Sequence, residues 1–157
     1  MMEAYNMSTT QTIERTTLTH LIHNEDYCRK VIPFIKPLYY ANRQERVVFE
    51  EIEKFLDKYN TLPTKETLTI GVDNRKDIND EDYKKVVDII SSLDKTEVDL
   101  QWLHDETEKF CKDKAIYNAV LDGISIIDGK DKNRTPEAIP SILSEALSVS
   151  FDLSVGH

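Results

Sequence analysis

Apolar residues recur at helical spacing along most of the chain, and this pattern predicts a series of amphipathic helices. The first helix is expected to begin near Gln11 and to carry an apolar stripe that includes Leu18 and Leu21. A second is expected over residues 25–32, because the residue before a proline, here Pro33, disfavours helical backbone. Residues 1–10 show almost no apolar periodicity, so we expect a disordered leader there.

Capping residues divide the middle of the chain into three further helices. Asn42, followed by Glu45, resembles a capping box, and the apolar positions after it predict a buried helix of about five turns. Thr64 is expected to cap a short helix that ends at Gly71, because glycine is common just past a helix C-terminus. Asn79 is expected to cap the next helix, which has three acidic residues in its first turn.

The longest helical pattern runs from about Asp99 to Asp128 and ends at Gly129. At about 1.5 Å per residue it would span roughly 45 Å, more than a small core can cover. Apolar residues on it recur every seven positions, which is the spacing of a helix packed lengthwise on another. The long helix is therefore expected to have a helical partner.

A last helix should supply that partner. Thr135 and Pro136 are expected to open it, and its apolar face is expected to extend to Phe151. We therefore predict an all-α fold with a globular helical head over residues 11–95 and a C-terminal antiparallel helical hairpin over residues 96–152.

An apolar stripe on the hairpin would remain uncovered by the head. Two hairpins that pack across a dyad would bury it and give a self-complementary dimer. The residues expected at this subunit interface are Leu103, Phe110, Tyr117, Leu121, Ile124, Ile139, Leu143 and Leu147.

Composition supports the helical interpretation and limits the function. The 157 residues make one domain, and only four Gly and five Pro are too few for a barrel or sandwich of many short strands. The net charge of −9 argues against a phosphate-binding surface, since affinity for nucleic acid comes mainly from clustered Lys and Arg. Any role near DNA is expected to act through another protein.

Acidic residues are concentrated between residues 72 and 109, where they serve either solubility or the binding of a basic partner. They could also be imagined as acid–base pairs, but a solvated or partner-facing surface explains them without catalysis. Trp102, the only tryptophan, lies in this stretch with Asp105 and Glu106. A tryptophan is often a core residue, but at an interface it would be an anchor, so these three form a candidate partner surface.

Residues for catalysis, cofactor binding and metal binding are not expected in this chain. None of the four glycines belongs to a GxxxxGK[ST] phosphate loop. His20, His23 and Cys28 lie close together in sequence, but zinc sites need a second pair of ligands elsewhere. We expect Cys28 and Cys111 to be reduced, packed thiols. With no apolar run of about 18 residues and no signal peptide, the protein is expected to be cytosolic and to have no membrane partner.

Six stretches of the chain occur together in a recognisable order. They are Leu18–Tyr27 (LTHLIHNEDY), Asn60–Pro63 (NTLP), Trp102–Phe110 (WLHDETEKF), Ala138–Leu143, Ala146–Asp152 and Val155–His157. The last three form a C-terminal run that is similar to the segment that joins the N-terminal domain to the motor in the replicative helicases of T-even-type phages. The order of elements also resembles the N-terminal domain of bacterial DnaB-type helicases.

The resemblance implies a non-catalytic collar domain of a replicative helicase. In this family such domains pair through their hairpins and assemble as three dimers on a hexameric ring, where they dock primase and are met by a helicase loader. The motor, with its ATP and Mg²⁺, would lie beyond His157, and residues 153–157 would begin the linker to it. No catalytic residue is carried over, and the expected location is the cytoplasm of a phage-infected bacterium.

Two other interpretations stay open at the level of sequence. The chain could be a free-standing acidic helical adaptor or inhibitor that binds a basic partner, in which case a stop codon would follow His157. It could also be a small metal-dependent enzyme, which stoichiometric metal in an elemental analysis would reveal.

Overall fold

The computed structural model describes the backbone of residues 2–151 and the side chains of residues 13–151. Within these residues there are helices and no strands, so the predicted all-α class is confirmed. The α-helices are α1 (Met2–His23), α2 (Glu25–Val31), α3 (Arg43–Tyr59), α4 (Lys65–Asp73), α5 (Asp80–Ser91), α6 (Leu100–Ile127) and α7 (Ile139–Leu147). Three 3₁₀ turns complete the set: η1 (Ile32–Phe34), η2 (Pro37–Tyr39) and η3 (Pro136–Ala138).

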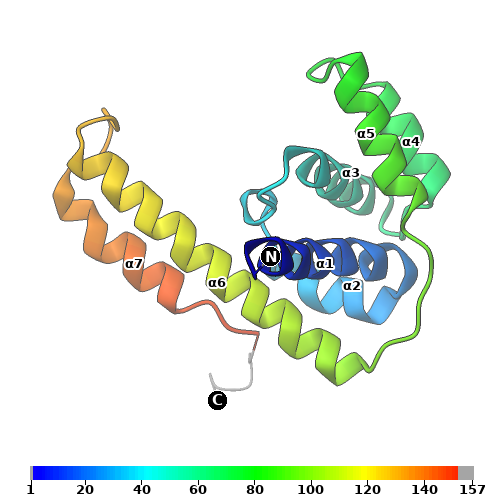
Figure 1. Ribbon diagram of the computed structural model, residues 1–157, viewed down its shortest axis with the longest axis horizontal. Coiled ribbons are helices and arrows are strands. Elements are labelled where there is room, and N and C mark those ends of the chain that lie inside the picture. The colour runs from blue at the N-terminus through cyan, green and yellow to red at the C-terminus, as the bar shows by residue number, and fades with distance from the viewer. Residues whose placement is uncertain (1, 152–157) are drawn as a thin grey trace.

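The molecule has a head and a projecting hairpin (Figure 1). Helices α1 to α5 form the head, with α4 and α5 at the end farthest from the hairpin. Helix α6 crosses the head with its first half, and its second half extends beyond the head with α7 packed antiparallel along it. The boundaries of a leader, a head and a hairpin domain stay predictions, and residues 152–157, which include the expected linker, lie outside the described residues.

The helix caps predicted at Asn42 and Asn79 are present, because each side chain accepts a hydrogen bond from the backbone N–H three residues on. Asp99, which was predicted only as the approximate start of the long helix, caps it in the same way. The full reciprocal capping box occurs at Thr64, whereas at Asn42 only half of it forms. Glu45, expected to complete that box, instead accepts a hydrogen bond from a side chain of α1.

Two predicted helix boundaries were wrong: the beginning of the first helix and the end of the fourth. Helix α1 begins at Met2 rather than near Gln11, so the backbone of the expected leader is helical. The missing apolar stripe does not stop a helix in a segment without Gly or Pro. Helix α4 continues through Gly71 to Asp73. A β-carbon at Gly71 would meet the carboxylate of Glu51, so this glycine marks a close approach of α3 and not a helix end.

The last helix is shorter than predicted. Thr135 and Pro136 open the 3₁₀ turn η3, and α7 itself runs only to Leu147. Phe151, which was expected on the apolar face of this helix, lies beyond its end. Its ring packs on Phe34, with ring centroids 4.7 Å apart, and it returns the chain to the head.

Candidate subunit and partner surfaces

The first half of α6 is anchored in the core of the head. Leu103 and Phe110 are only 1% and 6% exposed, and Phe110 packs against the aromatic rings of Tyr39 and Tyr40. The Thr107 hydroxyl is hydrogen-bonded to a buried tyrosine hydroxyl of α2 at 2.7 Å. This half of the helix therefore belongs to the same hydrophobic core as α1 to α3.

The second half of α6 is covered on one side by α7. Asn118 donates a hydrogen bond of 3.1 Å to the backbone carbonyl of Leu38 in η2, which connects α6 to the head. Beyond it, three buried residues one helical turn apart, Ala119, Gly123 and Ile126, form the face toward α7. Ala119 and Gly123 are small enough to let the two helices approach closely. Gly123 lies beside a methyl group of Ile139.

The other face of this half is apolar and open to solvent. Six of its side chains are between 37% and 69% exposed and follow one another at helical spacing. We call them the apolar strip, which extends about 17 Å along the helix at about 1.5 Å per residue. Its members are Ile116, Tyr117, Val120, Leu121, Ile124 and Ile127. Contiguous exposed apolar surface of this kind marks a site of interaction.

The structure divides the residues predicted at the subunit interface. Tyr117, Leu121 and Ile124 belong to the apolar strip. Leu103 and Phe110 were wrongly expected to be available for a partner, because in the single chain the head already covers them.

The three predicted residues of the short arm also differ among themselves. Ile139 and Leu143 are half-buried, while Leu147 is exposed. The interface hypothesis did not include Ile116, Val120 and Ile127, although their spacing of three and four residues beside Tyr117 could have indicated the same face.

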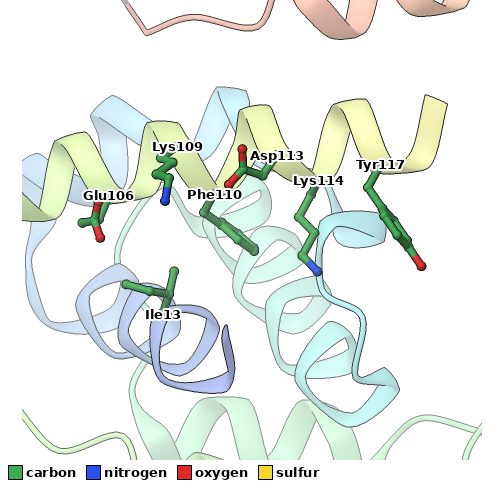
Figure 2. A pocket seen from close by; sticks show the side chains of 7 residues that line it. All are labelled: Ile13, Glu106, Lys109, Phe110, Asp113, Lys114 and Tyr117. Carbon is green, nitrogen blue, oxygen red and sulfur yellow. The ribbon is translucent and has the colours of Figure 1, made fainter. Parts of the chain in front are cut away.

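A groove lies between α1 and the middle of α6 (Figure 2). Its volume is about 310 Å³, and Tyr117 of the apolar strip forms part of its wall together with Lys114 and Ile13. The Lys114 ammonium group lies 5.8 Å from the centre of the Tyr117 ring, within range of a cation–π interaction. The apolar strip and the head thus meet at this groove.

The candidate partner surface lies near the start of α6, far along the helix from most of the apolar strip. Trp102 is 46% exposed and Asp105 is exposed, while Glu106 is half-buried and lines the groove of Figure 2. Leu100, next to Trp102, is also exposed and was not predicted as part of this surface. An exposed tryptophan beside a leucine and a carboxylate is a suitable anchor for a partner protein.

Several of the clustered acids have structural partners within the chain. Asp82 accepts a hydrogen bond of 3.0 Å from Gln44 and pairs with Arg43. Glu108 accepts one of 2.6 Å from the backbone N–H of Phe151. These contacts join α3 to α5 and the segment after α7 to α6, so part of the acidic stretch holds the fold together.

The histidines and cysteines considered as metal ligands each have their own packing environment. His23 is hydrogen-bonded to a backbone carbonyl at 2.7 Å, and His20 packs edge-on against Tyr27. Cys28 and Cys111 are free and buried, as predicted, and burial raises the pKa of their thiols to about 11 and about 12. In the part of the chain that the structure describes, no three His, Cys, Asp or Glu side chains gather into a metal site.

Comparison with known proteins gives one clear relative. A DnaB-like replicative helicase of Enterobacteria phage T4 is 32% identical to the chain over 148 residues. The match covers 89% of the chain and 31% of the helicase, so the chain spans about a third of that protein's length. No protein-family model matches the chain. Among the described residues, no helix is long and apolar enough to cross a membrane.

Proposed function

Because the chain is a relative of the DnaB-like replicative helicases, we propose that it is the non-catalytic N-terminal collar of such a helicase. Its role would be to pair subunits and so organise the hexameric ring. The observation that carries the proposal is the apolar strip, which lies on the part of α6 that extends beyond the head. ATP and Mg²⁺ would be bound by a motor domain outside these residues.

Pairing across a dyad explains why the apolar strip lies on a hairpin. A helix face that extends beyond its own head can lie along the same face of a second copy without a clash between the two heads. Burial of apolar surface contributes roughly 25 cal/mol per Å², so six side chains on each copy would supply a large part of the association free energy. Leu147, exposed on the short arm, would lie at the margin of this contact.

The test uses substitutions of exposed strip residues only. We expect the double variant Tyr117→Glu/Leu121→Glu to weaken self-association of the 157-residue chain at least tenfold in sedimentation velocity, because two carboxylates would be buried at the interface. Its circular dichroism should stay helical, since both side chains are about half exposed. Phe110→Glu is unsuitable here, because it would place a charge inside the head.

The matched control is Ile70→Glu, an equally exposed apolar residue on α4 at the other end of the head. It should leave the dimer unchanged. An unchanged dimer in the double variant, or a wild-type chain that is monomeric at high concentration, would contradict hairpin pairing.

The second part of the proposal concerns primase, which would dock on the collar at Trp102, Asp105 and Glu106. Support comes from the exposure of Trp102 and from its distance along α6 from the apolar strip, so that pairing and docking can occur together. A helicase loader would be a further partner of the assembled ring. We expect Trp102→Ala to reduce capture of the cognate primase more than tenfold, while Tyr59→Ala, an exposed aromatic residue on α3, leaves it unchanged.

A further inference from the structure

Two buried carboxyl groups face each other between the first and third helices. Glu14 of α1 is 2% exposed and Glu45 of α3 is 1% exposed. Each has one buried oxygen, Oε1, without a hydrogen-bond partner among the described residues. Glu45 is close enough to Glu14 for its negative charge to raise the pKa of the Glu14 carboxyl. Since two ionised carboxylates in such a place would repel each other and lose their hydration, one shared proton would satisfy both.

Two cationic side chains lie beside this pair, and each contacts a different carboxyl group. Arg15 Nε donates a hydrogen bond of 3.0 Å to Glu45 Oε2. Lys114 Nζ of α6 lies 3.6 Å from Glu14 Oε1, which is an ion pair but too long for a good hydrogen bond. Glu14, which has no short contact with a cation, is therefore the group that retains a proton.

The protonation of Glu14 has a clear physical cause. Burial raises its pKa to about 7, and the neighbouring Glu45 acts in the same direction, while Lys114 opposes them. Tyr40 also faces the pair from the segment after η2. Its buried hydroxyl is hydrogen-bonded to Thr17 at 2.8 Å and its pKa lies well above the ordinary value, so it stays neutral.

Lys114 connects this buried pair to the surface of the long helix. It is one helical turn before Tyr117, and its ammonium group is 3.6 Å from Glu14 Oε1 and 5.8 Å from the centre of the Tyr117 ring. A second negative charge at Glu14 would draw Lys114 toward the interior and away from Tyr117. The protonation of one buried group can therefore influence the first turn of the apolar strip.

We propose that Glu14 and Glu45 share one proton and form a pH-sensitive clamp that holds α1, α3 and α6 together at the base of the hairpin. Loss of the proton would leave two buried carboxylates, one on α1 and one on α3, that repel each other. Its effect on subunit pairing rests on the proposed function, whereas the clamp itself does not.

The direction of the pH effect follows from proton binding in the two states. Between the ordinary value of 4.5 and about 7, the folded chain holds a proton on Glu14 that the unfolded chain has lost. Stability from this group is therefore greatest below pH 4.5, falls as the pH rises through this window, and stays constant above it.

The first experiment follows the Glu14 carboxyl carbon of the wild-type chain by carbon-13 NMR between pH 3 and pH 9. A titration midpoint near 7 supports the clamp. A midpoint near 4.5 overturns it. This measurement needs no variant and so does not depend on whether a substituted chain folds.

The second experiment compares urea unfolding at pH 5 and pH 8 for the wild type, Glu14→Gln and Glu66→Gln, an exposed glutamate of α4. Gln can hydrogen-bond to Glu45 but cannot ionise. Between pH 5 and pH 8, the unfolding equilibrium constants of the wild type and of Glu66→Gln should rise. We expect this rise to be on the order of a hundredfold larger than the rise for Glu14→Gln. Equal pH dependence in all three proteins would overturn the proposal.

Sedimentation at the same two pH values separates the clamp from the proposed function. Weaker self-association at pH 8 in the wild type, absent in Glu14→Gln, supports control of pairing by the clamp. If Glu14 titrates near 7 but pairing does not respond to pH, the link to pairing is wrong and the clamp stands. If the chain never self-associates, the proposed pairing fails and the NMR result still decides the clamp.

Discussion

The two halves of α6 have the same apolar face but different neighbours. In the first half Leu103 and Phe110 lie in the core of the head, while one and two heptads further on Tyr117 and Ile124 face solvent. The periodicity of seven is continuous across this change. It shows that a heptad pattern predicts which face of a helix is apolar, whereas the length of the neighbouring elements decides what covers that face.

The largest expected effect is on the free energy of unfolding, when an aromatic side chain is truncated in each half of α6. Phe110→Ala should lower the free energy of unfolding by about 3 to 4 kcal/mol, because it leaves a cavity beside Tyr39 and Tyr40. Tyr117→Ala should lower it by less than about 0.5 kcal/mol, since that ring is exposed. Urea unfolding of both variants, followed by circular dichroism at a protein concentration below the dimerisation range, measures the difference. Similar losses in the two variants would mean that the halves do not differ as the structure indicates.

How far the sequence predicts the fold also differs between these regions. The caps at Thr64 and Asn79 and the end of α6 before Gly129 follow from local chemistry, and they are present. The exception at Gly71 depends on a contact with α3, more than a dozen residues away in sequence, which a local pattern does not contain.

The surfaces show the same limit. The sequence indicated Tyr117, Leu121 and Ile124 correctly as apolar positions on one face, but it could not separate them from Leu103 and Phe110. Whether one of these residues is buried or exposed depends on where η2 and α1 end relative to α6. That arrangement is a property of the tertiary structure. The pairing of Glu14 with Glu45 was not predicted either, because the two residues belong to different helices and the sequence assigned Glu45 to a capping box.

A smaller effect is expected from separating the two arms of the hairpin. Gly123→Leu places a large side chain against Ile139, where even a β-carbon would already be in van der Waals contact. We expect a loss of about 1 to 3 kcal/mol in unfolding free energy, because overpacking forces the helices apart. Hydrogen exchange should increase mainly in α7, while amides of α3 in the head stay protected.

Gly123→Ala is the matched control for that variant. Its added methyl group fits the available space and removes the cost of glycine in a helix, so stability should stay equal or rise by up to about 1 kcal/mol. A destabilising Gly123→Ala would show that α7 lies closer to α6 than in the structure.

The smallest effect concerns the boundary between the two halves, at Asn118. Its side chain donates to the Leu38 carbonyl at 3.1 Å, but Leu38 is itself exposed, so water can replace the lost donor in Asn118→Ala. We therefore expect a loss of only about 0.5 to 1 kcal/mol. The comparison with Gln101→Ala, which removes an exposed hydrogen bond within α6, isolates the contact between the hairpin and the head. Because Asn118 holds α6 to η2, its loss should increase the amide hydrogen exchange of η2 and of the middle of α6, and leave that of α7 unchanged. Equal exchange in Asn118→Ala and Gln101→Ala would place the boundary between the two halves elsewhere on α6.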